Sequence, residues 1–282
     1  MTIRRPRLFP LVLSLPLLLW QLAFFLFPLL FLVAISFWTV RNFQMTPDLN
    51  FANWERILTR NTFWDAYART AMLATASAVL TSLIAFPAAY AISFKLSDRV
   101  KQWLIFVLII PFFTSYLVRI YALQVFLSDA GIINALLGML GIGPVLMLNT
   151  TFGTLVGMVT LCLPLVILLQ IFSLNFVNRD LIEAAHNLRC GRLRTVLLVI
   201  VPSARVGLVI AALFAFILSF GDFVSPLYLG GGNPPTLSIM ITDITKSGQQ
   251  WPRAAVVALM MIGTLLTVAF AAITFAYKER GK

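Results

Sequence analysis

Four long stretches of this 282-residue chain contain no charged side chain. A helix of about 20 apolar residues is long enough to cross the hydrocarbon core of a bilayer. Each of the four stretches reaches that length, so the pattern predicts helices that lie in a membrane. The stretches are residues 8–40, 70–94, 130–178 and 254–277.

The composition favours the same class of protein. Of all residues, 60% are hydrophobic and 11% are charged, whereas a soluble domain carries about 25% charged residues. The net charge of +11 sits in short basic patches beside the apolar stretches, which argues against a partner nucleic acid. Two cysteines and one histidine provide neither a disulfide framework nor the ligands of a metal site. We therefore expect an integral membrane protein without a metal or cofactor.

We predict an all-α, polytopic fold with six transmembrane helices in a single domain of residues 1–282. The third helix should be kinked, because Pro111 lies within it and Arg119 interrupts it. The apolar stretch after Arg7 is far longer than the roughly 7–15 residues of a signal peptide, so we expect it to be retained as the first helix. The six helices are expected at residues 11–38, 68–93, 102–127, 152–174, 204–223 and 254–277.

The basic residues orient these helices. Cytoplasmic loops carry an excess of Lys and Arg, and an arrangement with both termini in the cytoplasm places 14 basic residues on that side and 6 on the other. We therefore predict that both termini are cytoplasmic. The 14 are Arg4, Arg5, Arg7, Lys95, Arg99, Lys101, Arg179, Arg189, Arg192, Arg194, Arg205, Lys278, Arg280 and Lys282. The 6 are Arg41, Arg56, Arg60, Arg69, Lys246 and Arg253.

Three of the connecting segments on the outer side have a composition that allows a structural prediction. Residues 41–67 contain two tryptophans among mixed charges, which predicts an interfacial helix at about residues 53–58. Residues 128–151 hold one charge and several glycines, and fit either a short helix or re-entrant segment, or an ordinary interfacial loop. Residues 230–235 are a cluster of turn residues, and no Gly-Lys-Ser/Thr follows them as it would in a phosphate-binding loop.

The segment 181–188 opens a long basic loop between two very apolar segments. A helix over these residues is amphipathic. Such a helix at a membrane surface either lies on lipid or docks into a groove of a partner. Two adjacent alanines suit close docking more than burial in lipid. The apolar face would hold Leu181, Ile182, Ala185 and Leu188.

The same loop resembles a known family. Glu-Ala-Ala, then a glycine region, then an apolar run ending in proline is similar to the EAA loop of ABC-importer permease subunits, and here it would cover residues 174–203. In that family the loop forms a coupling helix that sits in a cleft of the ATPase subunit. The resemblance implies this coupling role for Glu183, Ala184, Ala185, Gly191 and Pro202.

One position departs from the family pattern. The glycine that normally follows six residues after the glutamate is Arg189 here, and Gly191 comes two residues later. We expect the turn that ends the helix to have shifted toward Gly191, since glycine adopts left-handed backbone conformations easily. The alternative to a coupling role is a basic cytoplasmic loop that only anchors the topology.

Further segments are similar to spermidine/putrescine-type permease subunits of binding-protein-dependent importers. The resemblance implies a transmembrane subunit, in the cytoplasmic (inner) membrane, that forms a pathway for polyamines or related small cationic solutes. It also implies four kinds of partner: a second homologous permease, ABC ATPase subunits, an extracytoplasmic substrate-binding protein and membrane lipid. The segments are residues 111–122, 131–134, 178–185 and 219–223.

No catalytic constellation occurs in the sequence. It contains no Ser/His/Asp set, no pair of carboxylates at useful spacing and no Walker sequence. We therefore expect no catalytic residue, and we expect ATP hydrolysis on a separate partner chain.

Arg119 is the costliest residue in the predicted spans, because a charged side chain at the centre of a bilayer costs about 2.5–3.5 kcal/mol on insertion scales. Asp222 near the end of the fifth span is the obvious partner, and we favour a contact of Arg119 with Asp222, or with a backbone carbonyl, that simply joins two helices. In the alternative, Asp222 faces the pathway and attracts an ammonium group, with aromatic faces supplied by Tyr116, Tyr121 or Phe223.

Two other classes of function fit the composition. An ion-coupled secondary transporter usually shows internal repeats and acidic residues at the bilayer midplane, and neither is evident here. A membrane scaffold subunit is also compatible with the sequence. Co-purification of an ATPase chain with Walker motifs would separate the importer from both.

Overall fold

The computed structural model describes residues 8–278, and the side chains of residues 13–278. The chain divides into two compact units. One comprises Met1–Phe63 with Met240–Ile262, and the other comprises Trp64–Ile239 with Gly263–Lys282. Five of the basic residues that were used to predict the topology lie outside the described residues: Arg4, Arg5, Arg7, Arg280 and Lys282.

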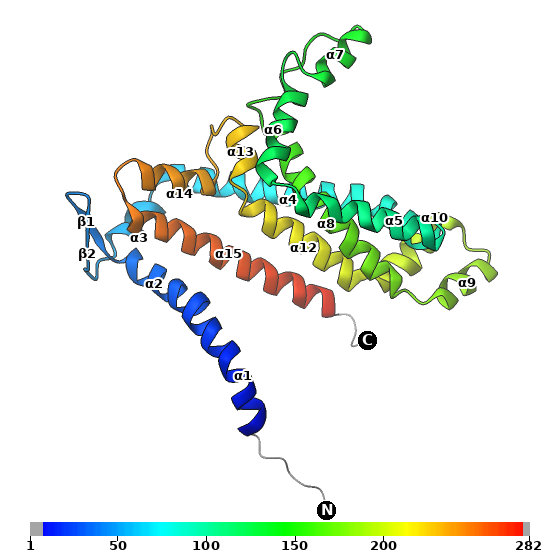
Figure 1. Cartoon of the computed structure of the whole chain (residues 1–282), viewed down its shortest axis with the longest axis horizontal. Coiled ribbons are helices and arrows are strands. Elements are labelled where there is room, and N and C mark those ends of the chain that lie inside the picture. The colour runs from blue at the N-terminus through cyan, green and yellow to red at the C-terminus, as the bar shows by residue number, and fades with distance from the viewer. Residues whose placement is uncertain (1–7, 279–282) are drawn as a thin grey trace, which may run out of the picture. The chain divides into compact units, whose positions relative to one another are not determined.

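The first unit begins with one long helical segment (Figure 1). α1 (Leu8–Gln21) continues through a π-helical turn at Leu22–Leu26 into α2 (Phe27–Ser36), in agreement with the helix predicted at residues 11–38. Within the described residues, none of the apolar window of this segment is buried by the rest of the chain. Apolar side chains that the chain itself leaves uncovered suit a lipid environment.

A short hairpin that was not predicted follows α2. β1 (Thr39–Arg41) pairs antiparallel with β2 (Gln44–Thr46), with Thr39 opposite Thr46. Asn42 and Phe43 both have positive φ, at 50° and 60°, which is the backbone of a two-residue hairpin turn.

α3 (Ala52–Leu58) confirms that a helix forms at residues 53–58. It is fastened to the end of α2, because the Asn53 amide donates to the carbonyls of Ser36 and Trp38 at 3.0 and 2.8 Å.

The second unit holds most of the remaining helices. Three of them, α4 (Asn61–Phe94), α14 (Leu237–Lys246) and α15 (Trp251–Tyr277), contain residues of both units. The others are α5 (Asp98–Ile109), a 3₁₀ turn at Ile110–Phe113, α6 (Tyr116–Leu127), α7 (Ile132–Met139), α8 (Thr151–Asn175), α9 (Arg179–Asn187), α10 (Arg192–Thr195), a π-helical turn at Val196–Ile200, α11 (Val201–Ser203), α12 (Arg205–Phe220) and α13 (Val224–Tyr228).

The number of membrane helices agrees with the prediction of six. Among the described residues, five helices are long and apolar enough to cross a membrane, and a bent pair makes a sixth crossing if it counts as one span. The pair consists of Arg192–Ser203 and Arg205–Phe220, which meet at 78°. Pro202 lies just before the bend and has no N–H with which to continue the helix.

The third predicted helix, residues 102–127, is wrong as a single element. The chain breaks between α5 and α6, where Thr114 and Ser115 are extended, and the 3₁₀ turn that contains Pro111 precedes the break. The helix was predicted to be kinked at Pro111, but it is interrupted completely between α5 and α6. The candidate span in this region consists instead of α6 and α7 together, from Tyr116 through Met139.

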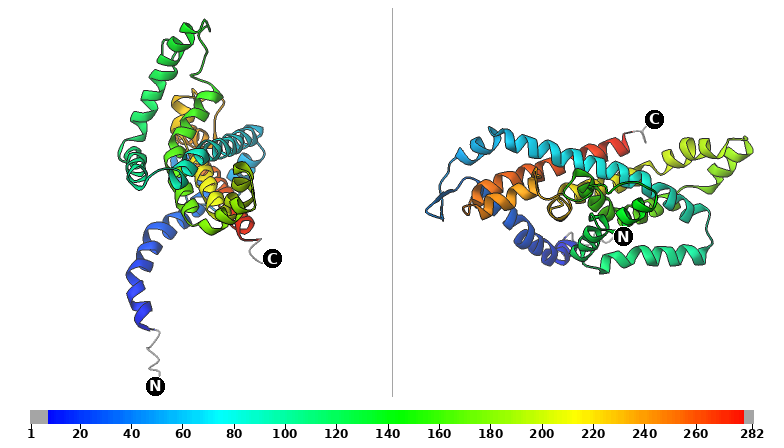
Figure 2. Two further views of the ribbon diagram at one scale, coloured as in Figure 1. Left: turned by 90° about the vertical axis from the view of Figure 1, so that its right-hand side faces the viewer. Right: turned by 90° about the horizontal axis from the view of Figure 1, so that it is seen from above.

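α7 forms a short helix within residues 128–151, which favours the first of the two readings of that segment. Figure 1 and the left view of Figure 2 show α6 and α7 projecting away from α8 and α12.

Small side chains let the long helices of the second unit approach closely. α4, α8 and α12 share a buried core in which alanines on α4 and α12 face branched residues on α8. At Gly207 of α12, an added Cβ would stand 2.3 Å from the Ser173 Oγ of α8. Close backbone approach at small residues is typical of helix packing in membranes. The alanines are Ala78, Ala85, Ala89, Ala211 and Ala215.

Candidate functional site

α9 is the helix predicted from the Glu-Ala-Ala segment, and it begins at a defined cap. The Asn178 side chain accepts a hydrogen bond from the Asp180 N–H at 2.9 Å, and Asp180 lies in the first turn, where a negative charge is favourable. In Figure 1 and in the right view of Figure 2, α9 projects from one end of the second unit, far from α13.

The apolar face predicted for this helix is only half covered. Ala185 is buried, with 8% of its surface exposed, and Ile182 is partly buried. Leu181 and Leu188 are 50% and 84% exposed. One part of the face therefore packs on the chain, and the other part is open to a partner.

The expected shift of the helix-ending turn toward Gly191 is wrong. Arg189 itself adopts the left-handed conformation, with φ of 56°. The Cys190 N–H donates to the Ala185 carbonyl at 3.0 Å and closes the end of the helix. Gly191 has an ordinary extended conformation, with φ of −63°. The turn thus stays where the family places its glycine, and the arginine carries a strain of about 1–2 kcal/mol.

Pro202, another of the predicted coupling residues, lies where the loop joins the bundle. The 78° bend follows it, and α12 begins at Arg205. The Ser173 hydroxyl of α8 donates to the carbonyl of Ala204 at the bend, at 2.9 Å. The loop that carries α9 is therefore joined to α12 through a bend that is fixed to α8.

Glu183 lines a cavity of about 290 Å³ beneath α9. The lining also includes Tyr90 and Phe94 at the end of α4, the following Lys95, and His186 of α9. Glu183 itself is exposed, as is Ala184. The carboxylate is thus accessible from outside the chain.

The predicted ion pair between Arg119 and Asp222 is wrong. Within the described residues, Asp222 Oδ2 accepts from the Tyr116 hydroxyl at 2.9 Å, and Oδ1 accepts from the Val224 and Ser225 N–H groups at 2.9 and 3.4 Å. Arg119 lies 5.8 Å from the centre of the Tyr116 ring, and its Nε has no hydrogen-bond partner in this part of the chain. The Asp222 carboxylate therefore receives its hydrogen bonds from Tyr116 and from the start of α13.

The other predicted pathway aromatics fall outside this network. Tyr121 is 50% exposed and its ring meets that of Tyr228, with centroids 5.3 Å apart. Phe223 is partly buried and immediately precedes α13. Asp222 has only 7% of its surface exposed, so the structure does not bring it and Tyr121 to one open surface.

Two sets of polar contacts between helices escaped the sequence analysis. The Ser219 hydroxyl of α12 donates to the Ser77 hydroxyl of α4 at 2.8 Å, and lies 3.4 Å from the Cys162 sulfur of α8. The Ser225 hydroxyl of α13 lies 2.6 Å from the Tyr116 hydroxyl of α6. Small polar residues within apolar spans were the available signal, because hydroxyls in a membrane core satisfy one another across helices.

These features match a known family. Residues 81–278 match the family described as binding-protein-dependent transport system inner membrane component. The chain belongs to this family. The matched region contains α9, the bend at Pro202 and the Asp222 network. The chain is therefore a multi-pass inner-membrane subunit of an importer.

Several curated relatives are similar over most of their length. The chain is 29% identical over 269 residues to the spermidine/putrescine transport system permease protein PotB of Haemophilus influenzae, covering 93% of this chain and 91% of the relative. It is 26% identical over 255 residues to PotB of Escherichia coli, covering 88% and 92%. It is also 30% identical over 220 residues to the E. coli inner membrane ABC transporter permease protein YdcU, covering 72% and 69%.

A solved structure shares the fold. A chain from the crystal structure of a bacterial ABC transporter involved in the import of the acidic polysaccharide alginate matches with a TM-score of 0.74 and 16% identity, covering 96% of both chains. The same kind of transporter in complex with its pentasaccharide-bound periplasmic protein matches with a TM-score of 0.71 and 15% identity, covering 94% of this chain and 92% of that chain. At this identity the likeness establishes the permease fold alone.

Proposed function

We propose that this chain couples ATP hydrolysis on a separate ATPase to solute passage, with α9 as the helix that docks into the ATPase. The observation that carries the proposal is the half-covered apolar face of α9, with Leu188 84% exposed beside an accessible Glu183. A helix that presents apolar side chains and one charge to its surroundings has the form of a helix that docks in a groove.

The loop has a mechanical connection to the transmembrane bundle. A displacement of α9 reaches α12 through the bend after Pro202, and the bend is held to α8 by the Ser173 hydroxyl. Movement of the ATPase subunits would then tilt α12 against α8 and favour one of two access states. The remaining partners in this proposal are a second homologous permease and a soluble substrate-binding protein on the outer side.

Polyamines are the proposed solutes. The support is the name of the relatives that cover about nine-tenths of this chain, spermidine/putrescine transport system permease proteins. Tyr121 offers an exposed ring face to an ammonium group. Asp222 has an indirect role in this proposal, because its oxygens are occupied by Tyr116 and by the start of α13.

Both termini are proposed to be cytoplasmic, which places α9 on the ATPase side. Reporter fusions after Ala52, Ser97, Gly141, Arg192 and Gly231 should alternate out, in, out, in, out. Two neighbouring fusions that report the same side would overturn this topology.

Reconstituted vesicles test the function. The chain is purified with its co-expressed partners and placed in vesicles, and uptake of labelled putrescine is measured with the binding protein outside and ATP inside. We expect uptake that requires ATP and ceases when the ATPase is omitted. Uptake driven by an ion gradient without ATP would support a secondary transporter instead.

A further inference from the structure

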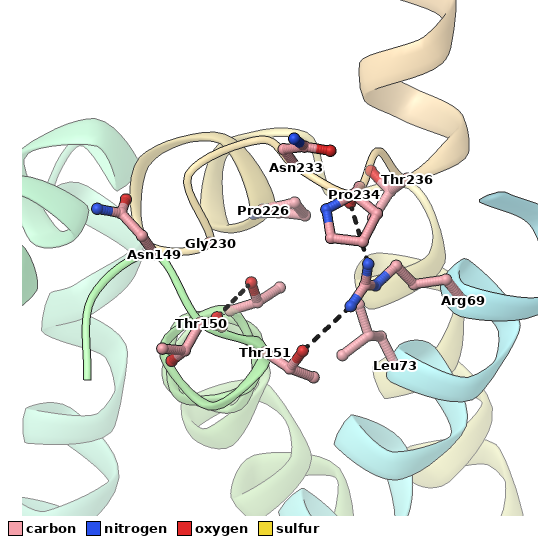
Figure 3. Close-up of a pocket in the computed structure, with 11 residues that line it drawn as sticks. Arg69, Leu73, Asn149, Thr150, Thr151, Pro226, Gly230, Asn233, Pro234 and Thr236 are labelled. Atoms are coloured by element: carbon pink, nitrogen blue, oxygen red, sulfur yellow. Dashed lines mark hydrogen bonds between the residues drawn. The ribbon is translucent and has the colours of Figure 1, made fainter. Parts of the chain in front are cut away.

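A cavity of about 280 Å³ lies in the second unit, apart from the Asp222 network and from α9. Its walls come from α4, from the start of α8 and from the loop after α13 (Figure 3). Arg69 of α4 reaches across the cavity and donates to the Thr151 hydroxyl at 3.2 Å and to the Pro234 carbonyl at 3.4 Å. Arg69 therefore links the three segments that line the cavity.

The chemistry of the lining is that of an anion site. Arg69 is the one charged residue among the lining residues, and no carboxylate accompanies it. A guanidinium carries five N–H donors, and its two hydrogen bonds in the cavity leave others available. A cavity with one unneutralised cation attracts a single negative charge and repels a diamine.

A second observation points to a ligand. Thr236 lines the same cavity, and only 2% of its surface is exposed. Its hydroxyl has no hydrogen-bond partner among the described residues. A buried hydroxyl without a partner costs free energy that a hydrogen-bonding ligand would recover.

The loop after α13 is built to fit this cavity. Gly230 faces α8 so closely that an added Cβ would stand 2.2 Å from the Thr154 Oγ1. Gly231 and Gly232 follow with φ of 71° and 73°, a conformation that favours glycine. These glycines bring the Pro234 carbonyl and Thr236 to the side of the cavity opposite α8.

We propose that this cavity binds a small solute through a carboxylate held by Arg69, with Thr236 hydrogen-bonded to the same solute. A carboxylate matches the planar fork of a guanidinium. The volume equals that of about nine water molecules in the liquid, which suits a solute of four or five carbons. This inference goes beyond the polyamine proposal and does not depend on it.

A series of four-carbon probes tests the proposal. The purified full chain in detergent is titrated calorimetrically with butyrate, 4-aminobutyrate and putrescine at constant ionic strength. We expect the two carboxylates to bind with one site per chain and putrescine not to bind there. Absence of carboxylate binding, or equal binding of putrescine, would overturn the proposal.

Variants assign the binding to this cavity. Arg69→Gln should weaken binding of butyrate about tenfold or more, because it removes a charge-assisted pair. Thr236→Val should weaken it severalfold while leaving the two Arg69 hydrogen bonds in place, so a folding defect in Arg69→Gln does not decide the test. Thr81→Val is the matched control, since Thr81 is also fully buried with an unpartnered hydroxyl but does not line the cavity. Unchanged binding in Thr236→Val, or equal loss in Thr81→Val, would contradict the assignment.

The outcome is separate from that of the proposed function. A chain that supports ATP-dependent putrescine uptake but binds neither carboxylate refutes this inference alone. A chain that binds carboxylates through Arg69 but imports no putrescine refutes only the polyamine proposal.

Discussion

The two ends of the second unit differ in which side chains they bury and which they expose. At the end that carries α13, polar groups are turned inward: Asp222 is 7% exposed and receives hydrogen bonds from Tyr116 and from two backbone N–H groups. At the end that carries α9, apolar groups are turned outward, with Leu188 84% exposed and Arg189 held in a strained conformation. The first end is complete within the chain, whereas the second has surface that a partner would cover.

The comparison separates stability from function. Substitutions near α13 should lower the free energy of unfolding, because they disturb contacts within the chain. Substitutions on the exposed part of α9 should leave folding intact and remove activity, because the contacts proposed for this face lie with a partner.

The largest expected effect is the loss of ATP-dependent uptake in Glu183→Arg. Glu183 is exposed beside the proposed docking face, so reversal of its charge should weaken binding of the ATPase without harming insertion. Uptake in vesicles should fall to background at normal abundance. Asp180→Arg on the same helix is the matched control, and should retain most of the uptake. Near-normal uptake by Glu183→Arg would remove the coupling role.

A double-mutant cycle at the α13 end tests whether Asp222 and Arg119 interact. Asp222→Leu leaves buried donors without an acceptor and should lower the free energy of unfolding by about 1–3 kcal/mol. Because Arg119 is not its partner, adding Arg119→Leu should not rescue it, and the two effects should add within about 0.5 kcal/mol. Tyr116→Phe with Asp222→Asn is the positive control and should show coupling. Recovery in the Arg119/Asp222 double variant, seen in detergent unfolding, would restore the ion pair.

Alanine substitutions at two glycines, Gly157 and Gly263, test how closely α8 packs against α13. At Gly157 of α8, an added Cβ would stand 2.6 Å from the Ser225 Oγ and 2.7 Å from Leu229 Cδ1. Gly157→Ala should therefore destabilise the chain by about 1–3 kcal/mol. Gly263→Ala on α15 meets nothing within 4 Å and should stabilise by about 0.5–1 kcal/mol. Equal melting temperatures for the two variants would show that α13 does not pack as described.

The smallest effect is expected at the end of α9. Arg189→Gly relieves a left-handed conformation and should raise stability by about 1 kcal/mol or less. Gly191→Ala should be neutral, because its φ is ordinary and its Cβ would meet nothing within 4 Å. Thermal unfolding of both variants checks this. A larger loss from Gly191→Ala would place the turn at Gly191 after all.

Much of the fold was predictable because the membrane imposes simple rules. Charge-free stretches predicted the helices that became α4, α8 and α15, and the amphipathic segment at 181–188 predicted α9. The division of α5 from α6 was only hinted at by Pro111, because a proline predicts a disturbance but not whether the chain turns away.

The site was harder to predict because its contacts are long-range. Asp222 and Arg119 were paired as opposite charges in apolar surroundings. The nearest donors to Asp222 prove to be a tyrosine hydroxyl from α6 and the backbone two residues on. At Arg189, residue preference favoured a turn at Gly191, but the hydrogen bond from the Cys190 N–H to the Ala185 carbonyl holds the turn in place.

Cross-linking from α9 tests the central claim most directly. Leu188→Cys in a Cys190→Ser background places one reactive thiol on the exposed part of the helix, and Leu136→Cys on α7, 56% exposed, is the control on the predicted outer side. Vesicles that contain the partners are treated with a short bifunctional thiol–amine reagent. We expect Leu188→Cys, and not Leu136→Cys, to be joined to a chain with Walker motifs. A cross-link to that chain from residue 136 but not from residue 188 would contradict the assignment of α9 as the coupling helix.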